Sequence, residues 1–484
     1  MIEDLRQFLA ACQELGEVTE IHDADWHEEI GALTEATAEL IDNPPALLFD
    51  RIKGYPAGYR VFALPLATHT RIAAALGIDP RKPKLEVLRE ASNRMNQAQS
   101  RPIPPVEVGT APVMENVLKG DQIDMLKFPV PLYHSSDGGR YIGTGDSLIN
   151  RDPESGFINM GTYRQQVHGR DLLGLWMSPG QQGRQICQKF WDRGLACPVV
   201  ATYGTDPQVF FPSHTALPWG VCELDVAGGL RGAPVEVIPG PLTGLPIPAR
   251  AEIAIEGEVP PPKVEAADEG PFGEWPGYYS GGTRGTGEQQ PVIRIKALYH
   301  RNDPIIMSMP PLWPGAQEMG LDFKAALLWD QLESAGIQDV AGVWVHSRYL
   351  IVVAIRQRYA GHAKQAGMAV LGLNAIARNG RLVVIVDEDI DPSDLKEVLW
   401  AMETRVDPAR DIEIVDGAWS TPLDPRMPLD KRDNKDHTNS RAIFYAVRPF
   451  TWKDKFPQTS RSPRELRRQV IEKYRDVLYP HRSP

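Results

Sequence analysis

The amino-acid sequence predicts a mixed α/β protein in which an antiparallel β-barrel is flanked by two α/β domains and followed by a C-terminal helix. Strand-like and helical segments alternate at both ends of the chain, whereas residues 112–310 contain short apolar runs separated by turn residues. Glycine (42) and proline (43) are abundant, which indicates many turns. The length of 484 residues suits two or three domains.

Residues 1–111 are expected to form the N-terminal α/β domain. Its first helix is predicted from four apolar residues that share one helical face and are followed by Gly16: Leu5, Phe8, Leu9 and Cys12. Strands and helices then alternate, with strands expected at 46–49 and 61–64 and helices at 72–76 and 84–97.

Residues 112–314 are expected to form the central barrel. Short apolar runs bounded by Gly, Pro, Asn and Asp are typical of an antiparallel sheet with frequent turns. They predict strands at 158–160, 173–177, 199–203, 235–238, 251–255 and 292–299. Few helices are expected in this part, with one at 183–194.

Residues 315–450 return to an α/β pattern. The segment 382–386 is almost entirely apolar and β-branched, as expected for a strand that is covered on both faces. Further strands are expected at 343–345 and 350–355, helices at 323–334, 363–377 and 394–404, and a loop at 419–440.

The tail, residues 451–484, contains one predicted helix. Ser462 and Glu465 have the spacing of a capping box, and Pro463 lies between them at the expected first helical position. An amphipathic helix to Leu478 is therefore expected. A helix at a chain end usually packs somewhere, so we expect it to contact its own domain or a neighbouring subunit.

The charge and cysteine content exclude several classes of protein. The chain has 52 basic and 63 acidic residues, a net charge of −11, which disfavours nucleic acid or an anionic membrane as the main partner. Neither a signal peptide nor an apolar stretch long enough to span a membrane is expected. The four cysteines form no CxxC pair and are expected to be reduced thiols of a cytoplasmic protein.

The segment from Glu269 to Glu274 is the strongest candidate for chemistry. Two carboxylates flank a Gly-Pro-Phe-Gly turn whose backbone is restricted, so both side chains can be held toward one cavity. Paired carboxylates can divide their pKa values, so that one donates a proton while the other stays charged. Arg164, in a strand context, could hold a carboxylate bidentately. If these residues have no catalytic role, the two glutamates are solvated residues of a turn and Arg164 is a structural arginine.

Taken in order, these segments resemble the UbiD-type decarboxylases, which use prenylated FMN. The resemblance covers most of the chain and rests on Asn159…Arg164, Gly220–Glu223, Glu269–Glu274, Tyr359–Lys364 and Thr404–Asp411. The last two segments are more similar to the bacterial ubiquinone-pathway branch than to the ferulic acid decarboxylase branch. The resemblance implies that the central barrel is a split, flavin-reductase-like barrel that binds the cofactor.

The resemblance also implies roles for individual residues. Arg164, Glu269 and Glu274 match the catalytic trio, with Glu274 as the proton donor and Glu269 positioning Arg164. The resemblance also implies which residues contact the cofactor. They are Asn159, Thr162, Tyr163, Arg164, Trp176, Met177, Ser178, Gln181, Gln182, Ser213, His214 and Glu223.

Asn159, Gln182 and Glu223 match the positions that hold a divalent ion at the FMN phosphate, with potassium nearby. In many relatives the second position is a histidine, whereas here it is Gln182. The resulting donor set contains only oxygen, which favours magnesium, calcium or potassium alongside manganese. We therefore hypothesise a phosphate–cation site with an altered metal preference.

The expected function is prenylated-FMN-dependent, reversible decarboxylation of an aromatic or α,β-unsaturated acid, with CO2 as the other product. The expected partners are a flavin prenyltransferase that supplies the cofactor and further copies of the chain, as a homodimer or homohexamer. One alternative is the same chemistry on an aromatic-diacid CoA thioester, with a basic groove around Arg348, Arg356, Arg358 and Lys364, or carboxylation of a phenolic compound. Another is a non-catalytic subunit of a larger carboxylase. Substrate-facing residues are expected in the loops 309–314 and 421–426.

Overall fold

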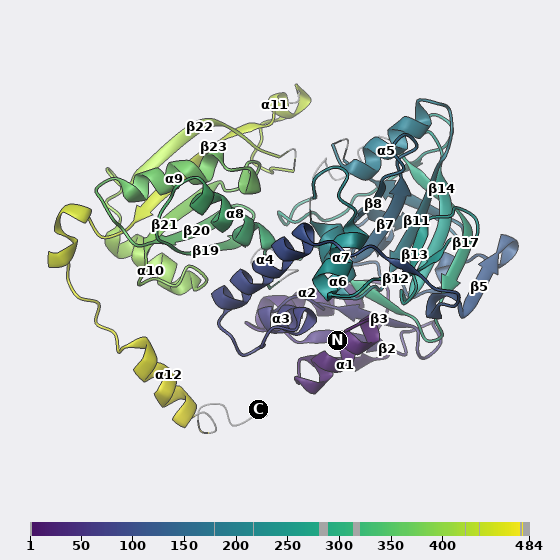
Figure 1. Cartoon of the computed structure of the whole chain (residues 1–484), viewed down its shortest axis with the longest axis horizontal. Helices are drawn as coiled ribbons and strands as arrows, with labels where there is room; N and C mark the ends of the chain where they lie inside the picture. The colour runs from purple at the N-terminus through teal and green to yellow at the C-terminus, as the bar shows by residue number, and fades with distance from the viewer. Residues whose placement is uncertain are drawn as a thin grey trace.

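The computed structural model describes residues 2–474 and 477, except residues 179, 216, 280–288, 313–319, 422 and 435. Figure 1 shows the N-terminal part in purple beside the central part in teal, with the C-terminal part in green on the other side of helix α4. The predicted mixed fold, with a curled antiparallel sheet between two α/β parts, is confirmed. The exact domain boundaries stay predictions.

The N-terminal part contains a four-stranded sheet in the order β1-β2-β3-β18. The last of these strands, β18 (Ile305–Ser308), comes from the central part of the sequence and runs parallel to β3. The other elements are α1 (Leu5–Glu14), β1 (Val18–His22), α2 (Glu29–Leu40), β2 (Ala46–Asp50), β3 (Arg60–Ala63), α3 (His69–Leu76) and α4 (Lys84–Ser100). The N-terminal and central parts are therefore joined by a shared sheet.

The central part is built on a nine-stranded sheet in the order β6-β9-β10-β17-β14-β11-β7-β8, with β5 also paired to β17. Neighbouring strands are antiparallel throughout. The strands are β5 (Asn116–Lys119), β6 (Arg140–Gly143), β7 (Asp146–Arg151), β8 (Ile158–Gly161), β9 (Arg164–Val167), β10 (Leu172–Trp176), β11 (Cys197–Tyr203), β14 (Ile253–Val259) and β17 (Val292–His300). Figure 1 shows this sheet curling around its core.

Three helices lie in the central part, where few were expected and only the first was located. These are α5 (Gln182–Trp191), α6 (Pro207–His214) and α7 (Glu223–Arg231). The prediction missed α6 and α7 because α6 carries prolines at its first position and inside, and α7 contains two adjacent glycines. Short strands complete this part: β4 (Val106–Glu107), β12 (Glu236–Pro239), β13 (Pro246–Pro248), β15 (Ala267–Asp268) and β16 (Gln289–Gln290).

The C-terminal part is a five-stranded sheet in the order β19-β20-β21-β23-β22. Its elements are α8 (Phe323–Ser334), β19 (Val340–Ser347), β20 (Leu350–Ile355), α9 (His362–Gly372), β21 (Leu382–Asp387), α10 (Leu395–Arg405), β22 (Ile412–Trp419), α11 (Leu429–Asp433) and β23 (Thr438–Ala446). The expected loop at 419–440 is partly wrong, since β22 and β23 enter it and α11 lies within it. Strand β22 is a largely exposed edge strand, so its sequence lacks a continuous apolar run.

Helix α12 (Arg464–Lys473) is present, but its predicted capping box is not. Pro463 occupies the N-cap position instead of the first helical position, and no side chain caps the helix. The end of the prediction, near Leu478, lies outside the described residues. Figure 1 shows α12 at the end of an extended connection, away from the sheets.

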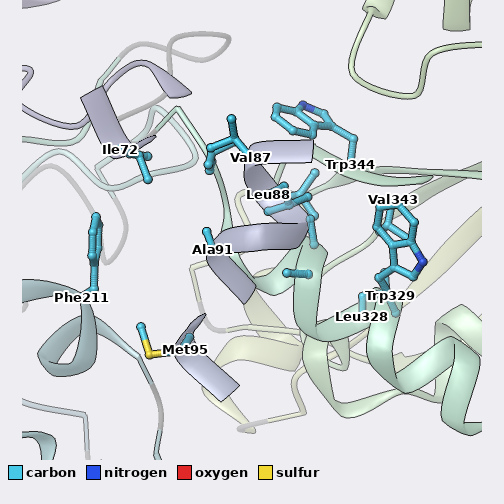
Figure 2. Packing of buried hydrophobic residues seen from close by; sticks show 14 of the residues in the cluster. Ile72, Val87, Leu88, Ala91, Met95, Phe211, Leu328, Trp329, Val343 and Trp344 are labelled. Carbon is cyan, nitrogen blue, oxygen red and sulfur yellow. The ribbon is translucent and has the colours of Figure 1, made fainter. Parts of the chain in front are cut away.

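Helix α4 ties the three parts together. Its residues Val87, Leu88 and Ala91 belong to one buried cluster that includes residues of the N-terminal, central and C-terminal parts. Figure 2 shows Ile72 and Phe211 on one side of this helix and Trp329 and Trp344 on the other. This packing sets the C-terminal sheet beside the central part.

The surface of α4 adds a charged link to the same junction. Arg89 pairs with Asp330 and Glu333 at 2.7 Å each, and its guanidinium carbon lies 4.7 Å from the centre of the Trp329 ring. An arginine that is held by two carboxylates and an aromatic face orients α8 on α4.

Among the described residues, the four cysteines are free, and three of them are buried. Burial raises the pKa of the Cys12 thiol to about 12, which keeps it protonated. These observations agree with the expected reduced core thiols. No helix in the described ranges has both the length and the apolar character needed to cross a membrane.

Candidate active site

Arg164 joins the two glutamates of the turn motif. It opens β9, where it lies opposite Trp176 of the neighbouring strand β10. Its Nη1 donates to Glu274 Oε1 at 2.6 Å and its Nη2 donates to Glu269 Oε2 at 2.8 Å, while Nε lies 2.7 Å from Glu269 Oε1. Only 7% of the Glu269 side chain and 14% of the Glu274 side chain are exposed, so the description of both as solvated turn residues is wrong.

Aromatic rings enclose the guanidinium of Arg164. Its carbon lies 4.9 Å from the Trp176 ring centre and 5.0 Å from that of Phe272. Phe272 in turn packs on Tyr141 at 4.2 Å, and the Tyr141 hydroxyl donates to Glu269 Oε1 at 3.1 Å. The rings exclude water from the arginine, so its attraction to the carboxylates is stronger than at a surface.

The turn that carries the two acids is fixed by the segment before β6. Gly270 has a φ of +87°, a conformation that favours glycine, and its N–H donates to Gln166 Oε1 at 3.1 Å. A Cβ on Gly138 would lie 1.8 Å from the Gly270 carbonyl oxygen, so this close approach requires glycine. Gly273 N–H donates to Asp137 Oδ1 at 3.2 Å. Glu269 and Glu274 are thus held by the backbone that separates them.

The surroundings raise the pKa of both Glu274 and Arg164, for different reasons. Burial raises the pKa of Glu274, and the charge of Glu269 adds to the rise, although Arg164 opposes it. Burial opposes the charge on Arg164, but Glu274 and Glu269 outweigh it and raise the pKa of the guanidinium. Glu274 therefore holds a proton more readily than an ordinary carboxyl, next to a permanently charged arginine.

The predicted metal positions come from three elements that meet behind Tyr163. Gln182 opens α5, Glu223 opens α7, and Asn159 lies in β8. Glu223 Oε2 accepts from the N–H of Met160, the residue after Asn159, at 2.8 Å. The Tyr163 hydroxyl accepts from the N–H of Gly183, the residue after Gln182, at 3.0 Å.

Two observations fit a cation at these residues. The amide nitrogen of Gln182 donates to Leu217 O at 2.7 Å, which leaves Gln182 Oε1 buried without a hydrogen-bond partner. Burial raises the pKa of Glu223 to about 7, since no described positive group offsets the loss of water around its charge. A hard cation with oxygen ligands would satisfy the amide oxygen and favour the charged carboxylate. The described residues contain no group of three or more His, Cys, Asp and Glu side chains around one point, in line with a donor set that has one carboxylate.

The other predicted cofactor residues lie around the same end of the sheet. Thr162 N–H donates to Ser213 O at 3.1 Å, and the two side-chain oxygens lie 3.3 Å apart. Ser178 N–H donates to Gln181 Oε1 at 2.7 Å, so the Gln181 side chain braces the turn in which it lies. Trp176 ends β10 and Met177 follows it, buried in the central core.

His214 is the most exposed of the predicted cofactor residues. Its ring stacks on Phe210 at 5.6 Å at the end of α6. Surrounding protein lowers the pKa of His214 to about 4, and the charges of Arg348 and Lys324 contribute. The imidazole is therefore neutral at physiological pH.

Asp146, in β7, was missed by the sequence analysis. Its Oδ2 accepts from Gln165 at 2.6 Å, whereas its Oδ1 is buried without a partner. Burial raises its pKa to about 8. It opens β7, whose sequence Asp-Ser-Leu-Ile-Asn-Arg mixes polar and apolar residues, so no signal in the sequence marks this acid as buried.

Two of the four residues expected to line a basic groove for an acyl carrier have acidic partners. Arg358 pairs with Asp339, and Lys364 pairs with Glu413 at 3.3 Å. Arg348 instead lies over Trp275, with its guanidinium carbon 4.9 Å from the ring centre. The substrate loops expected at 309–314 and 421–426 lie partly outside the described residues.

Three family models match the chain in order. Residues 9–95 match the 3-octaprenyl-4-hydroxybenzoate carboxy-lyase N-terminal domain, residues 105–313 its Rift-related domain and residues 319–446 its C-terminal domain. Together they cover most of the sequence.

Individual relatives and solved structures are also similar over most of the chain. The phenolic acid decarboxylase of Bacillus subtilis is 32% identical over 437 residues, which cover 87% of this chain and 89% of the relative. The pyrrole-2-carboxylic acid decarboxylase of Pseudomonas aeruginosa is 29% identical and covers 98% of both chains. The UbiD-class enzyme HmfF from Pelotomaculum thermopropionicum, solved in complex with FMN, has a TM-score of 0.83 at 29% identity, over 97% of this chain and 100% of that one. An evolved dimeric form of that enzyme was solved in complex with prFMN. By sequence and by fold, the chain belongs to the UbiD family of carboxy-lyases.

Proposed function

We propose that this protein is a prenylated-FMN-dependent decarboxylase of an aromatic or α,β-unsaturated carboxylic acid, able to work in both directions. The observation that carries the proposal is the ion-pair system in which Arg164 is held between two shielded glutamates. The named activities of the relatives and the flavin in the solved neighbours support it.

Decarboxylation at an sp2 carbon needs an electron sink that no side chain provides, and the bound cofactor supplies it. The protein provides a proton and an orientation. Glu274, whose pKa is raised by burial, donates a proton to the carbon that has lost CO2 and removes a proton from that carbon in the reverse direction. Glu269 accepts from both Arg164 and Tyr141, which fixes its carboxylate beside the guanidinium.

Asn159, Gln182 and Glu223 would hold a divalent cation, magnesium or manganese, that neutralises the cofactor phosphate, with potassium nearby. The buried, unpartnered Gln182 Oε1 supports this assignment. An acidic protein of net charge −11 needs such local neutralisation to bind a phosphate dianion.

The cofactor requirement implies a flavin prenyltransferase as its supplier, and we place both proteins in the cytoplasm. We further propose a homodimer or homohexamer, with α12 at a contact between copies. Its apolar residues Leu466, Val470 and Ile471 are between 45% and 50% exposed, as expected for a helix that packs on another surface.

The test is a substrate screen with protein co-expressed with a flavin prenyltransferase, using pyrrole-2-carboxylate, hydroxybenzoates and cinnamate. We expect CO2 release from at least one acid, and incorporation of deuterium at the carbon that loses CO2 when the reaction is run in D2O. Protein expressed without the prenyltransferase is the matched control. A holoenzyme with the prenylated-flavin spectrum that neither decarboxylates nor exchanges any acid would contradict the proposal and favour a non-catalytic subunit.

A further inference from the structure

Positively charged side chains of the C-terminal part lie close to the catalytic residues. Helix α6, which ends at His214, packs on the start of α8 through an edge contact between Phe211 and Phe323 at 5.2 Å. Lys324 follows Phe323 in the first turn of α8. The positive end of the α8 dipole adds to the charge of Lys324.

Arg348 approaches the same region from the turn between β19 and β20. Its guanidinium carbon lies 4.9 Å from the centre of the Trp275 ring, and Trp275 directly follows Glu274. The adjacent residue Tyr349 also packs on Trp275, with ring centres 4.9 Å apart. The C-terminal part thus contacts the catalytic turn through this residue pair.

Electrostatics link these groups to one another. Burial raises the pKa of Glu274, and the positive charge of Arg348 opposes this rise. Loss of water contact at the ring lowers the pKa of His214, and the charge of Arg348 lowers it further. Burial also lowers the pKa of Lys324, and Arg348 lowers it further. No described positive side chain influences the pKa of Glu223, so the cations face the proton donor and not the predicted metal site.

No ion pair or hydrogen bond joins Lys324 Nζ or the Arg348 guanidinium to another described residue, although the charge of Arg348 acts on Glu274 and its guanidinium lies over Trp275. The charge of Asp322 acts on Lys324, and the Asp322 carboxylate caps α8 by accepting from the Lys324 N–H at 2.8 Å. The other arginines of this face are engaged, since Arg381 pairs with Asp424 and Arg378 stacks on Trp419 at 4.3 Å. Two partly desolvated cations without partners are unfavourable unless an anion joins them.

The leaving carboxylate of the substrate is not the best occupant. Strong ion pairing to that group stabilises the ground state and is lost as CO2 forms, which slows the reaction. Binding to a part of the substrate that does not react provides affinity without this penalty. A second acidic group on the ring is such a part.

We propose that Lys324 and Arg348, beside His214, bind a second anionic substituent of the substrate, so that the preferred substrates are aromatic dicarboxylates. The proposal rests on the proposed function and names its substrate class. Lys324 and Arg348 act as specificity residues, while Arg164, Glu269 and Glu274 keep the roles given above.

The test compares pyrrole-2,5-dicarboxylate with pyrrole-2-carboxylate. Binding is measured by calorimetry on the full chain loaded with FMN, in wild type and in Lys324→Met and Arg348→Met. We expect the wild type to bind the diacid at least 10-fold more tightly, and each variant to lose about 10- to 100-fold in diacid affinity while monoacid affinity changes less than 3-fold. Lys364→Met is the matched control, because Lys364 is an exposed lysine that pairs with Glu413. We expect it to bind both acids as the wild type does.

Equal affinity of the wild type for both acids would overturn the proposal, as would variants that lose both acids equally. A loss of FMN affinity of more than 10-fold in both variants, with an unchanged ratio of diacid to monoacid affinity, would assign the cations to the cofactor phosphate and also overturn it. Because binding to FMN-loaded protein needs no turnover, diacid selectivity without any decarboxylation by the holoenzyme would refute the proposed function alone.

Discussion

Replacing Glu274 by glutamine tests the proton donor directly. The substitution keeps the size of the side chain and leaves an amide oxygen that can accept from Arg164 Nη1, which lies 2.6 Å from Glu274 Oε1. Arg164 also keeps Glu269, which it contacts through Nε at 2.7 Å and Nη2 at 2.8 Å. The guanidinium therefore remains neutralised, and the site should keep its shape.

The structure allows the size of each effect to be worked out. A hydrogen bond to a charged group contributes about 1.5–3 kcal/mol and a neutral one about 1 kcal/mol, so weakening the Arg164 bond costs about 1 kcal/mol. Removing a buried charge offsets part of that cost. We expect the free energy of unfolding to change by about 1 kcal/mol or less. Loss of the general acid should lower kcat by a factor of about 10² to 10⁴.

The assay measures CO2 release and deuterium exchange at the reacting carbon, with the flavin spectrum recorded for each preparation. We expect Glu274→Gln to retain the cofactor spectrum and lose both activities. Glu265→Gln is the control, because Glu265 pairs with Arg294, a residue outside the catalytic trio. A kcat within threefold of wild type in Glu274→Gln would refute the role of Glu274. Loss of the cofactor would show instead that the residue is needed for binding.

Three further predictions follow from other residues. Gln182→His replaces an amide oxygen with an imidazole and should raise the zinc and manganese content relative to magnesium, as measured by elemental analysis of FMN-loaded protein; an unchanged metal profile would remove Gln182 from the site. Asp146 has a folded pKa of about 8, raised by burial, so the folded state binds more protons than the unfolded state between about pH 4 and pH 8, and stability falls as pH rises through this window. Asp146→Asn should flatten this dependence and raise Tm at pH 8.5 by several degrees relative to wild type, while an equal pH dependence in both proteins would show that Asp146 titrates normally. Truncation after Ser460 removes α12 and should reduce the assembly size in light scattering, and an unchanged mass would exclude α12 as a subunit contact.

Much of the fold could be predicted because local patterns are strong where one face of an element is buried. The first helix follows from Leu5, Phe8, Leu9 and Cys12, and the structure buries all four. The strand β21 has five buried residues and was predicted from its apolar β-branched composition. The elements that were missed have weak patterns. Helices α6 and α7 contain prolines or glycines and are held by packing, and β22 is an edge strand in which no residue is fully buried.

The sequence by itself predicted which residues carry the chemistry, because the segments around Arg164 and from Glu269 to Glu274 resemble those of the UbiD family. It also showed the exchange of histidine for Gln182. Only the tertiary structure decided which of these groups contact one another and how those contacts change their pKa values. The bridge from Arg164 to both acids spans more than a hundred residues of sequence. The contact of Arg348 with Trp275 joins the turn between β19 and β20 to the segment that carries Glu274. The physical reason is that a pKa and a binding preference depend on burial and on charges within a few ångströms, and those neighbours come from strands distant in the chain.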